Sequence, residues 1–147
     1  TTMADSKSSA NAPAEPSAAL RASVLVVEDN LVNRQVVVRM LEQLGCHVDV
    51  VENGALAVAA TRGANYDLVL MDCLMPVMDG WKAARAIRKI PGPSQQARIV
   101  AMTACGLQED RRRCLDAGMD DYMLKPLDLP SVREQVGKLS KRVAAAR

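Results

Sequence analysis

The chain has no phenylalanine, one tryptophan, two tyrosines and a single histidine among its 147 residues. Because it carries eight methionines instead, we expect an aliphatic, deformable core. The four cysteines, Cys46, Cys73, Cys105 and Cys114, form no CxxC pair, and only Cys46 and His47 lie close enough together to suggest a shared metal. That spacing does not make a zinc site, so we expect the cysteines to be small buried residues that stay reduced.

Strong charge and long apolar runs are also missing. The formal net charge is +2, which predicts no field strong enough to attract nucleic acid or acidic lipid, so we expect neither a nucleic-acid partner nor membrane contact by this chain. No apolar run approaches the roughly 18–20 residues that a membrane span needs. The N-terminus lacks the basic-then-apolar order of a secretory signal, and the cytoplasm is therefore the expected compartment.

Three common motifs of enzymes are absent. There is no GxxxxGK[ST] loop, which excludes a P-loop nucleotide site. No GxGxxG follows an apolar run, which excludes a dinucleotide fingerprint, and no GxSxG elbow presents a serine nucleophile. Any phosphate chemistry must therefore come from other residues.

The regular part of the chain alternates between two patterns. Residues 1–22 are small, polar and proline-containing, and we interpret them as a disordered leader or linker before a single domain at 23–147. Five short apolar runs predict strands, and each is followed by a segment with helical spacing. The strands are expected at Val24–Val27, His47–Val51, Asp67–Met71, Arg98–Met102 and Asp121–Leu124, and the helices at Leu31–Leu44, from Asn53-Gly54 to Arg62, Trp81–Lys89, Leu107–Ala117 and after Asp128. Strict alternation predicts an α/β fold, a doubly wound parallel sheet with helices on both faces.

Charged or hydroxyl-bearing residues that could form one site follow four of these strands. Glu28 and Asp29 follow the first, Asp72 the third, Thr103 the fourth and Lys125 the fifth. In such folds ligands bind outside the carboxyl ends of the strands. Three carboxylates at one point need a cation, and Mg²⁺ is the hard ion that suits oxygen ligands. A carboxylate so placed can take a phosphoryl group, with a lysine and a hydroxyl stabilising its oxygens.

Several polar residues in and near this set have a simpler interpretation. Asp29, Asn30 and Asp79 are common types of helix cap, Thr103 is another, and Lys125 before a proline could be a solvated loop charge. Agreement among four separate strand ends favours the shared site.

The residues resemble receiver domains of bacterial-type response regulators over about Ser23–Leu139. The resemblance rests on four segments: Val26-Val27-Glu28-Asp29-Asn30 with Asn33, Leu70-Met71-Asp72-Cys73-Leu74-Met75-Pro76-Val77-Met78-Asp79-Gly80, Ile99-Val100-Ala101-Met102-Thr103-Ala104, and Gly118-Met119-Asp120-Asp121-Tyr122-Met123-Leu124-Lys125-Pro126. It implies a flavodoxin-like (βα)5 fold with strand order 2-1-3-4-5.

The resemblance also implies roles for single residues. Asp72 would be the phosphoacceptor, and Mg²⁺ would be held by Glu28, Asp29, Asp72 and the backbone carbonyl of Leu74. Thr103 would be the switch hydroxyl and Tyr122 its aromatic partner. Lys125 would pair with the phosphoryl oxygens, through a cis bond to Pro126.

The residues that fill these motifs are most similar to those in receivers of hybrid sensor histidine kinases. That implies a sensor kinase or a histidine phosphotransfer domain as partner, docking on the first helix around Leu31, Asn33, Arg34 and Val37. The parent chain would then be a histidine kinase, with anchoring in the inner membrane left open. A stand-alone regulator and a docking module that needs no phosphorylation also remain open, whereas an aspartyl phosphohydrolase is disfavoured because Leu74 stands where such enzymes place a second acid.

Overall fold

The structure is a computed structural model and describes residues 22–73, 78–104 and 108–146. The described elements alternate strictly between strand and helix. In chain order they are β2 (Ser23–Val27), α1 (Leu31–Gln43), β3 (His47–Val51), α2 (Gly54–Gly63), β4 (Leu68–Asp72), α3 (Gly80–Lys89), β5 (Arg98–Thr103), α4 (Gln108–Asp116), β6 (Asp121–Leu124) and α5 (Leu129–Ala146).

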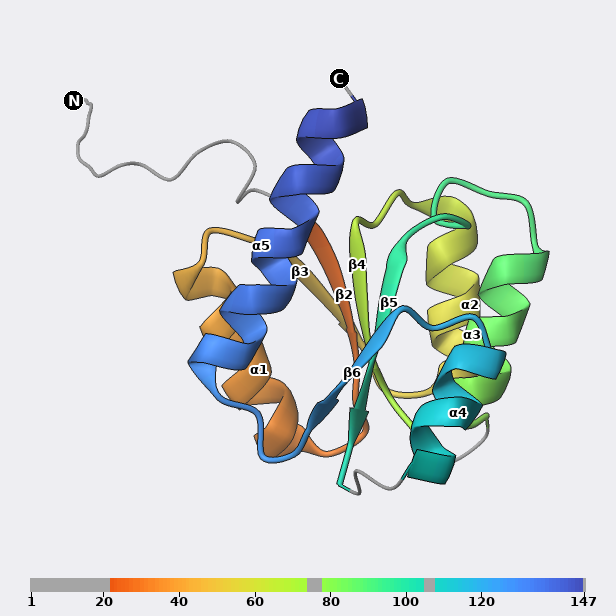
Figure 1. The fold of residues 1–147 in the computed structure, drawn as a ribbon, viewed down its shortest axis with the longest axis horizontal. Helices are drawn as coiled ribbons and strands as arrows, with labels where there is room; N and C mark the ends of the chain where they lie inside the picture. Colours follow the sequence, from red (N-terminus) through yellow and green to blue (C-terminus); the bar gives the residue numbers. More distant parts are fainter. Residues whose placement is uncertain (1–21, 74–77, 105–107, 147) are drawn as a thin grey trace.

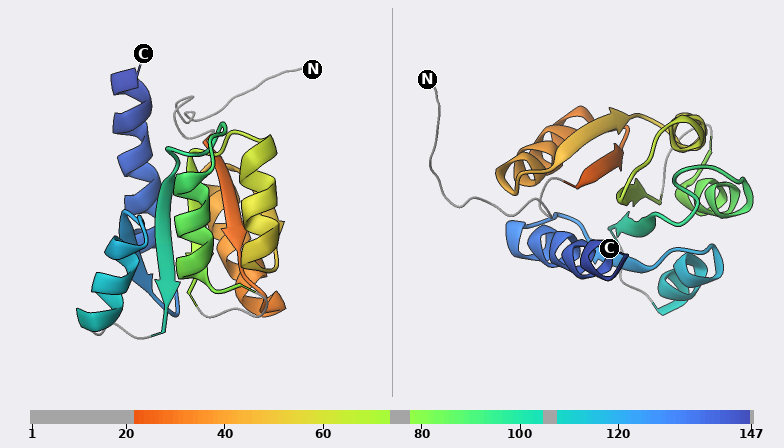
Figure 2. Two further views of the ribbon diagram at one scale, coloured as in Figure 1. Left: turned by 90° about the vertical axis from the view of Figure 1, so that its right-hand side faces the viewer. Right: turned by 90° about the horizontal axis from the view of Figure 1, so that it is seen from above.

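The strands form one parallel sheet in the order β3-β2-β4-β5-β6. Counted along the chain, this is the expected order 2-1-3-4-5. Helices α1 and α5 cover one face of the sheet, and α2, α3 and α4 cover the other (Figures 1 and 2). The doubly wound α/β prediction is therefore confirmed.

Covering both faces explains why the central strands are continuous apolar runs. Along β2, Val24 and Val26 pack in the cluster beneath α1 and α5, while Leu25 and Val27 pack in the cluster beneath α2, α3 and α4. All four side chains are 0% exposed, so each successive residue must be apolar. The edge strand β3 differs, because Val50 is 37% exposed there.

Polar side chains begin the helices where the sequence suggested caps. Asn30 accepts a hydrogen bond from the backbone N–H of Asn33, and Asp79 accepts one from Lys82, at 3.0 and 2.9 Å. Asp128 caps α5 in the same way through Ser131. The simpler interpretation of Asn30 and Asp79 as helix caps is therefore correct.

Ala22, at the end of the predicted leader, contacts the sheet. Ala22, which we assigned to the leader, is 5% exposed, and its carbonyl accepts a 2.9 Å hydrogen bond from the N–H of His47. This bond extends the pairing of β2 with β3 toward the N-terminus. The rest of the predicted leader lies outside the described residues.

Candidate phosphoryl-acceptor site

The parallel register brings the polar strand ends to one edge of the sheet, the lower edge in Figure 1. Asp72 is paired with Met102 and Thr103 with Leu124, so the ends of β4, β5 and β6 lie side by side. Glu28 directly follows β2, the other neighbour of β4.

Three carboxylates meet at this edge. Oxygen atoms of Glu28, Asp29 and Asp72 all lie within 4.8 Å of one another. Glu28 is 1% exposed and Asp72 6%, whereas Asp29 is exposed to solvent. Buried carboxylates repel unless a cation is near, and oxygen ligands at this spacing suit a hard divalent ion. The donor set therefore fits Mg²⁺, and Asp29 belongs to this cluster.

Lys125 supplies a cation to the same cluster. Its Nζ donates to Glu28 Oε1 at 2.9 Å and to Asp72 Oδ2 at 3.1 Å. Burial alone would lower the pKa of the Lys125 ammonium, but the hydrogen bonds to Glu28 and Asp72 outweigh burial and raise this pKa. Lys125 is therefore a fixed charge of the site and not a solvated loop residue. Its bond to Pro126 is cis, as expected.

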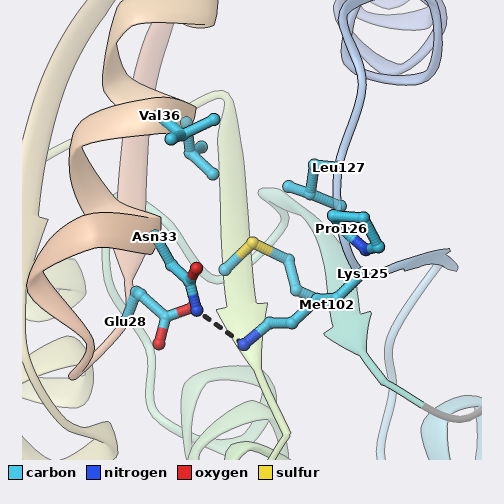
Figure 3. Close-up of a pocket in the computed structure, with 8 residues that line it drawn as sticks. Glu28, Asn33, Val36, Met102, Lys125, Pro126 and Leu127 are labelled. Atoms are coloured by element: carbon cyan, nitrogen blue, oxygen red, sulfur yellow. Dashed lines mark hydrogen bonds and ion pairs between the residues drawn. The ribbon is translucent and has the colours of Figure 1, made fainter.

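Glu28 uses both carboxylate oxygens. While Oε1 accepts from Lys125, Oε2 accepts from the backbone N–H of Asn30 at 3.1 Å. Figure 3 shows the Glu28–Lys125 contact across the gap between α1 and the segment that begins at Lys125. The buried glutamate thus ties the end of β2 to the end of β6, a link that the sequence did not reveal.

Thr103 and Tyr122 lie on the same face of the sheet. Tyr122 is paired with Ala101, which packs beneath α2, α3 and α4, and Thr103 stands two residues after Ala101. Side chains two apart in a strand point the same way, so Thr103 and Tyr122 are diagonal neighbours. Both are partly buried. This placement is compatible with the expected coupling between the hydroxyl and the ring.

Comparison with known proteins agrees with this geometry. The profile of the response regulator receiver domain matches residues 24–137. The chain belongs to that family. Its receiver fold is similar to the crystal structure of the receiver domain of sensor histidine kinase PA1611 from Pseudomonas aeruginosa PAO1, described with a magnesium ion coordinated in the active site cleft. The TM-score is 0.75 at 40% identity, covering 82% of this chain and 98% of that one.

Relatives of this receiver include hybrid kinases and a phosphotransfer complex. It is 40% identical over 127 residues to hybrid signal transduction histidine kinase L of Dictyostelium discoideum, covering 83% of this chain but 7% of the kinase. It is also similar to the receiver domain of Ssk1 from Saccharomyces cerevisiae, solved with the histidine phosphotransfer protein Ypd1, with TM-score 0.74, 29% identity, and 82% and 89% of the two chains covered. The receiver is thus homologous to receivers of hybrid histidine kinases and spans a small part of such proteins.

The residues expected on the docking face of the receiver lie at different depths. Leu31 is 58% exposed and Asn33 is exposed, whereas Arg34 is partly buried. Val37 is only 3% exposed and packs against the sheet, so its expected place on the surface is wrong. Rotation about the helix axis explains this, because Val37 and Leu41 are one turn apart on the inward side.

Two apolar residues that we did not assign to this face are exposed beside Leu31. Val32 is 66% exposed and Val36 43%. They are four residues apart on α1 and therefore lie on one side of the helix. The exposed apolar surface of α1 consists of Leu31, Val32 and Val36. No signal in the sequence indicated it, because the buried pair Val37 and Leu41 has the same i, i+4 spacing as the two valines.

Two further points concern membrane-spanning helices and Leu74. No helix in the described parts of the chain is long and apolar enough to span a membrane. Leu74, whose backbone carbonyl we expected to help hold Mg²⁺, lies outside the described residues.

Proposed function

We propose that this receiver takes a phosphoryl group from a phosphohistidine onto Asp72 in a Mg²⁺-dependent phosphorelay, as the receiver of a hybrid sensor histidine kinase. The observation that carries the proposal is the buried contact of Asp72 with Lys125 inside the cluster of three carboxylates. Family membership and the hybrid-kinase relatives support the type of pathway.

The residues of the site have distinct tasks in this transfer. An oxygen of Asp72 attacks phosphorus, the bond from phosphorus to the donor imidazole nitrogen breaks, and the electron pair returns to that nitrogen. Lys125, already 3.1 Å from Asp72, would then contact a phosphoryl oxygen. Glu28, Asp29 and Asp72, with the Leu74 carbonyl, would hold Mg²⁺, which supplies positive charge beside the phosphoryl oxygens. Thr103 would approach the phosphoryl group and Tyr122 would move toward the space it leaves.

An intact-mass measurement tests the phosphoacceptor. Incubated with Mg²⁺ and a small acyl-phosphate donor, the protein is expected to gain one phosphoryl group, because Asp72 ends β4 inside the carboxylate cluster and contacts Lys125. The gain should disappear when Mg²⁺ is removed and should be absent in Asp72→Asn. Asp79→Asn is the control, since Asp79 caps α3 and should leave the adduct intact. An adduct that persists in Asp72→Asn would contradict the assignment.

We propose further that the phosphotransfer partner contacts Leu31, Val32 and Val36, with Asn33 and Arg34 beside them. Leu31 and Arg34 also line a groove of about 440 Å³ that extends along α1 to Val50 of β3. The first of these side chains, Leu31, begins α1 two residues after Asp29, the second residue of the acidic pair Glu28-Asp29. A partner bound here would therefore hold its phosphohistidine near Asp72, and the Ypd1–Ssk1 complex gives precedent for such a partner.

Leu31→Asp is expected to slow phosphoryl transfer from a histidine-phosphorylated phosphotransfer protein by about tenfold or more, because a charge replaces an exposed apolar contact. Transfer from the small acyl-phosphate donor should be unchanged. Leu56→Asp is the matched control, since Leu56 is 46% exposed but lies on α2, on the other face of the sheet. The two rates are read from phosphoprotein bands over time. Equal slowing by both variants would place the partner elsewhere.

A further inference from the structure

Helix α4 has few buried side chains along its described part. Of its residues whose side chains are described, only Cys114 is buried, and Leu115 is 63% exposed. The helix therefore contributes little apolar surface to the core along the part we can describe. Other contacts must hold it against the sheet and against α3.

Arginine side chains provide two of those contacts. The guanidinium of Arg111 lies 5.2 Å from the ring centre of Tyr122, and that of Arg113 lies 3.8 Å from the ring centre of Trp81. Trp81 and Tyr122 are two of the three aromatic residues in the chain. Cation–π contacts of this kind are weak individually, so they can break and re-form during a conformational change.

The C-terminal end of α4 is fixed much more firmly. Arg88 of α3 donates from Nε to the carbonyl of Gly118 at 2.8 Å and from Nη2 to Asp120 at 2.9 Å. Met119, which follows Gly118, is 3% exposed. The turn after α4 is thus held by hydrogen bonds and burial, while Arg111, two turns earlier, is held by an aromatic ring.

We propose that Arg111 is a positioning residue that holds the ring of Tyr122 in the place it has in this structure, partly buried at the edge of the core cluster. The inference rests on the proposed function, because it assumes that phosphorylation draws Tyr122 inward. In this proposal an inward movement of the ring breaks the contact with the Arg111 guanidinium, so Arg111 opposes the switch. A contact that favours one state lowers the affinity of any ligand that requires the other state.

Fluorine NMR of protein labelled with 3-fluorotyrosine tests this directly. The chain has two tyrosines, and Tyr66→Phe leaves Tyr122 as the sole signal. Without any ligand, Arg111→Ala is expected to move the Tyr122 signal, and Arg111→Lys, which keeps the cation, to return it toward its original position. Arg112→Ala removes the same charge from the neighbouring exposed residue and should leave the signal in place. An unmoved signal in Arg111→Ala would overturn the proposal.

Titration with beryllium fluoride in the presence of Mg²⁺ provides the second readout. This phosphoryl analogue should half-saturate Arg111→Ala at about two- to fivefold lower concentration than the parent, the size expected for loss of one exposed cation–π contact. An unchanged or higher concentration would contradict the proposal. If the parent chain shows no response to the analogue, the proposed function fails instead, while the spectra of the unliganded variants still decide the role of Arg111.

Discussion

Replacing Lys125 with methionine is expected to lower the free energy of unfolding by about 1–3 kcal/mol in the absence of divalent ions. Lys125 is the cation that contacts both Glu28 and Asp72, whose side chains are 1% and 8% exposed. Without it, the two buried carboxylates lose the cation that they share. Urea unfolding at neutral pH measures the change, and Lys138→Met is the control, because Lys138 contacts Asp121 with 42% of its side chain exposed.

The same variant should respond more strongly than the parent to Mg²⁺. With the ammonium gone, an added divalent ion is the remaining cation for the cluster, so Mg²⁺ should recover much of the lost stability. The pKa of Lys125 is raised above its ordinary value of 10.5, so its stabilising charge is complete below that pH and is lost only as the pH rises through the folded pKa. The difference between parent and variant should therefore be constant from pH 7 to about pH 9. A variant as stable as the parent would show that Lys125 does not neutralise the cluster.

Gly80→Ala is expected to destabilise the protein by about 1–3 kcal/mol and to slow phosphorylation by about ten- to a hundredfold. A Cβ atom on Gly80 would collide with the backbone carbonyl oxygen of Asp72 and lie 3.0 Å from Cys73 Cα. The first turn of α3 lies directly against the backbone of Asp72, and the N–H of Gly80 donates to the carbonyl of Cys73 at 3.0 Å. An added methyl group must therefore move Asp72.

Gly137→Ala serves as the control for Gly80→Ala. Gly137 lies within α5, and a Cβ atom there would have no neighbour within 4 Å. This substitution should raise stability by up to about 1 kcal/mol, because alanine favours helix, and should leave phosphorylation unchanged. Thermal unfolding and the initial rate of phosphorylation by the small donor give both quantities. If the Gly80→Ala variant is phosphorylated at the normal rate, the end of β4 adapts to the methyl group without moving the Asp72 carboxylate.

Much of the fold could be predicted from the sequence because the signals were local. The central strands could be recognised in the sequence as continuous apolar runs. Burial on both faces leaves no polar position between Val24 and Val27, for example. Gly45 ends α1 at a φ of 85°, where glycine is favoured, and the Gly45 signal was visible in the sequence. The site followed from the rule that the carboxyl ends of parallel strands share one edge.

Details that depend on tertiary packing could not be predicted in the same way. The depth of Val37 and the exposure of Val36 differ only through the rotation of α1 on the sheet, and helical spacing alone did not separate them. The hydrogen bond between Lys125 and Glu28 joins residues 97 positions apart, and no sequence pattern indicates which carboxylate a lysine will contact. The ring contact of Arg111 with Tyr122 likewise needs the placement of α4 beside β6.

The sheet that separates the two apolar clusters also separates the proposed docking surface on α1 from the proposed switch at Tyr122. Leu31, Val32 and Val36 lie on the α1 side, while Tyr122 and Arg111 lie on the α4 side, and the strands between them are fully packed. Substitutions that share no neighbours act additively on free energy. Mutations could therefore retune the choice of phosphoryl donor on one side while the response on the other side is preserved, which makes such a domain easy to rewire during evolution.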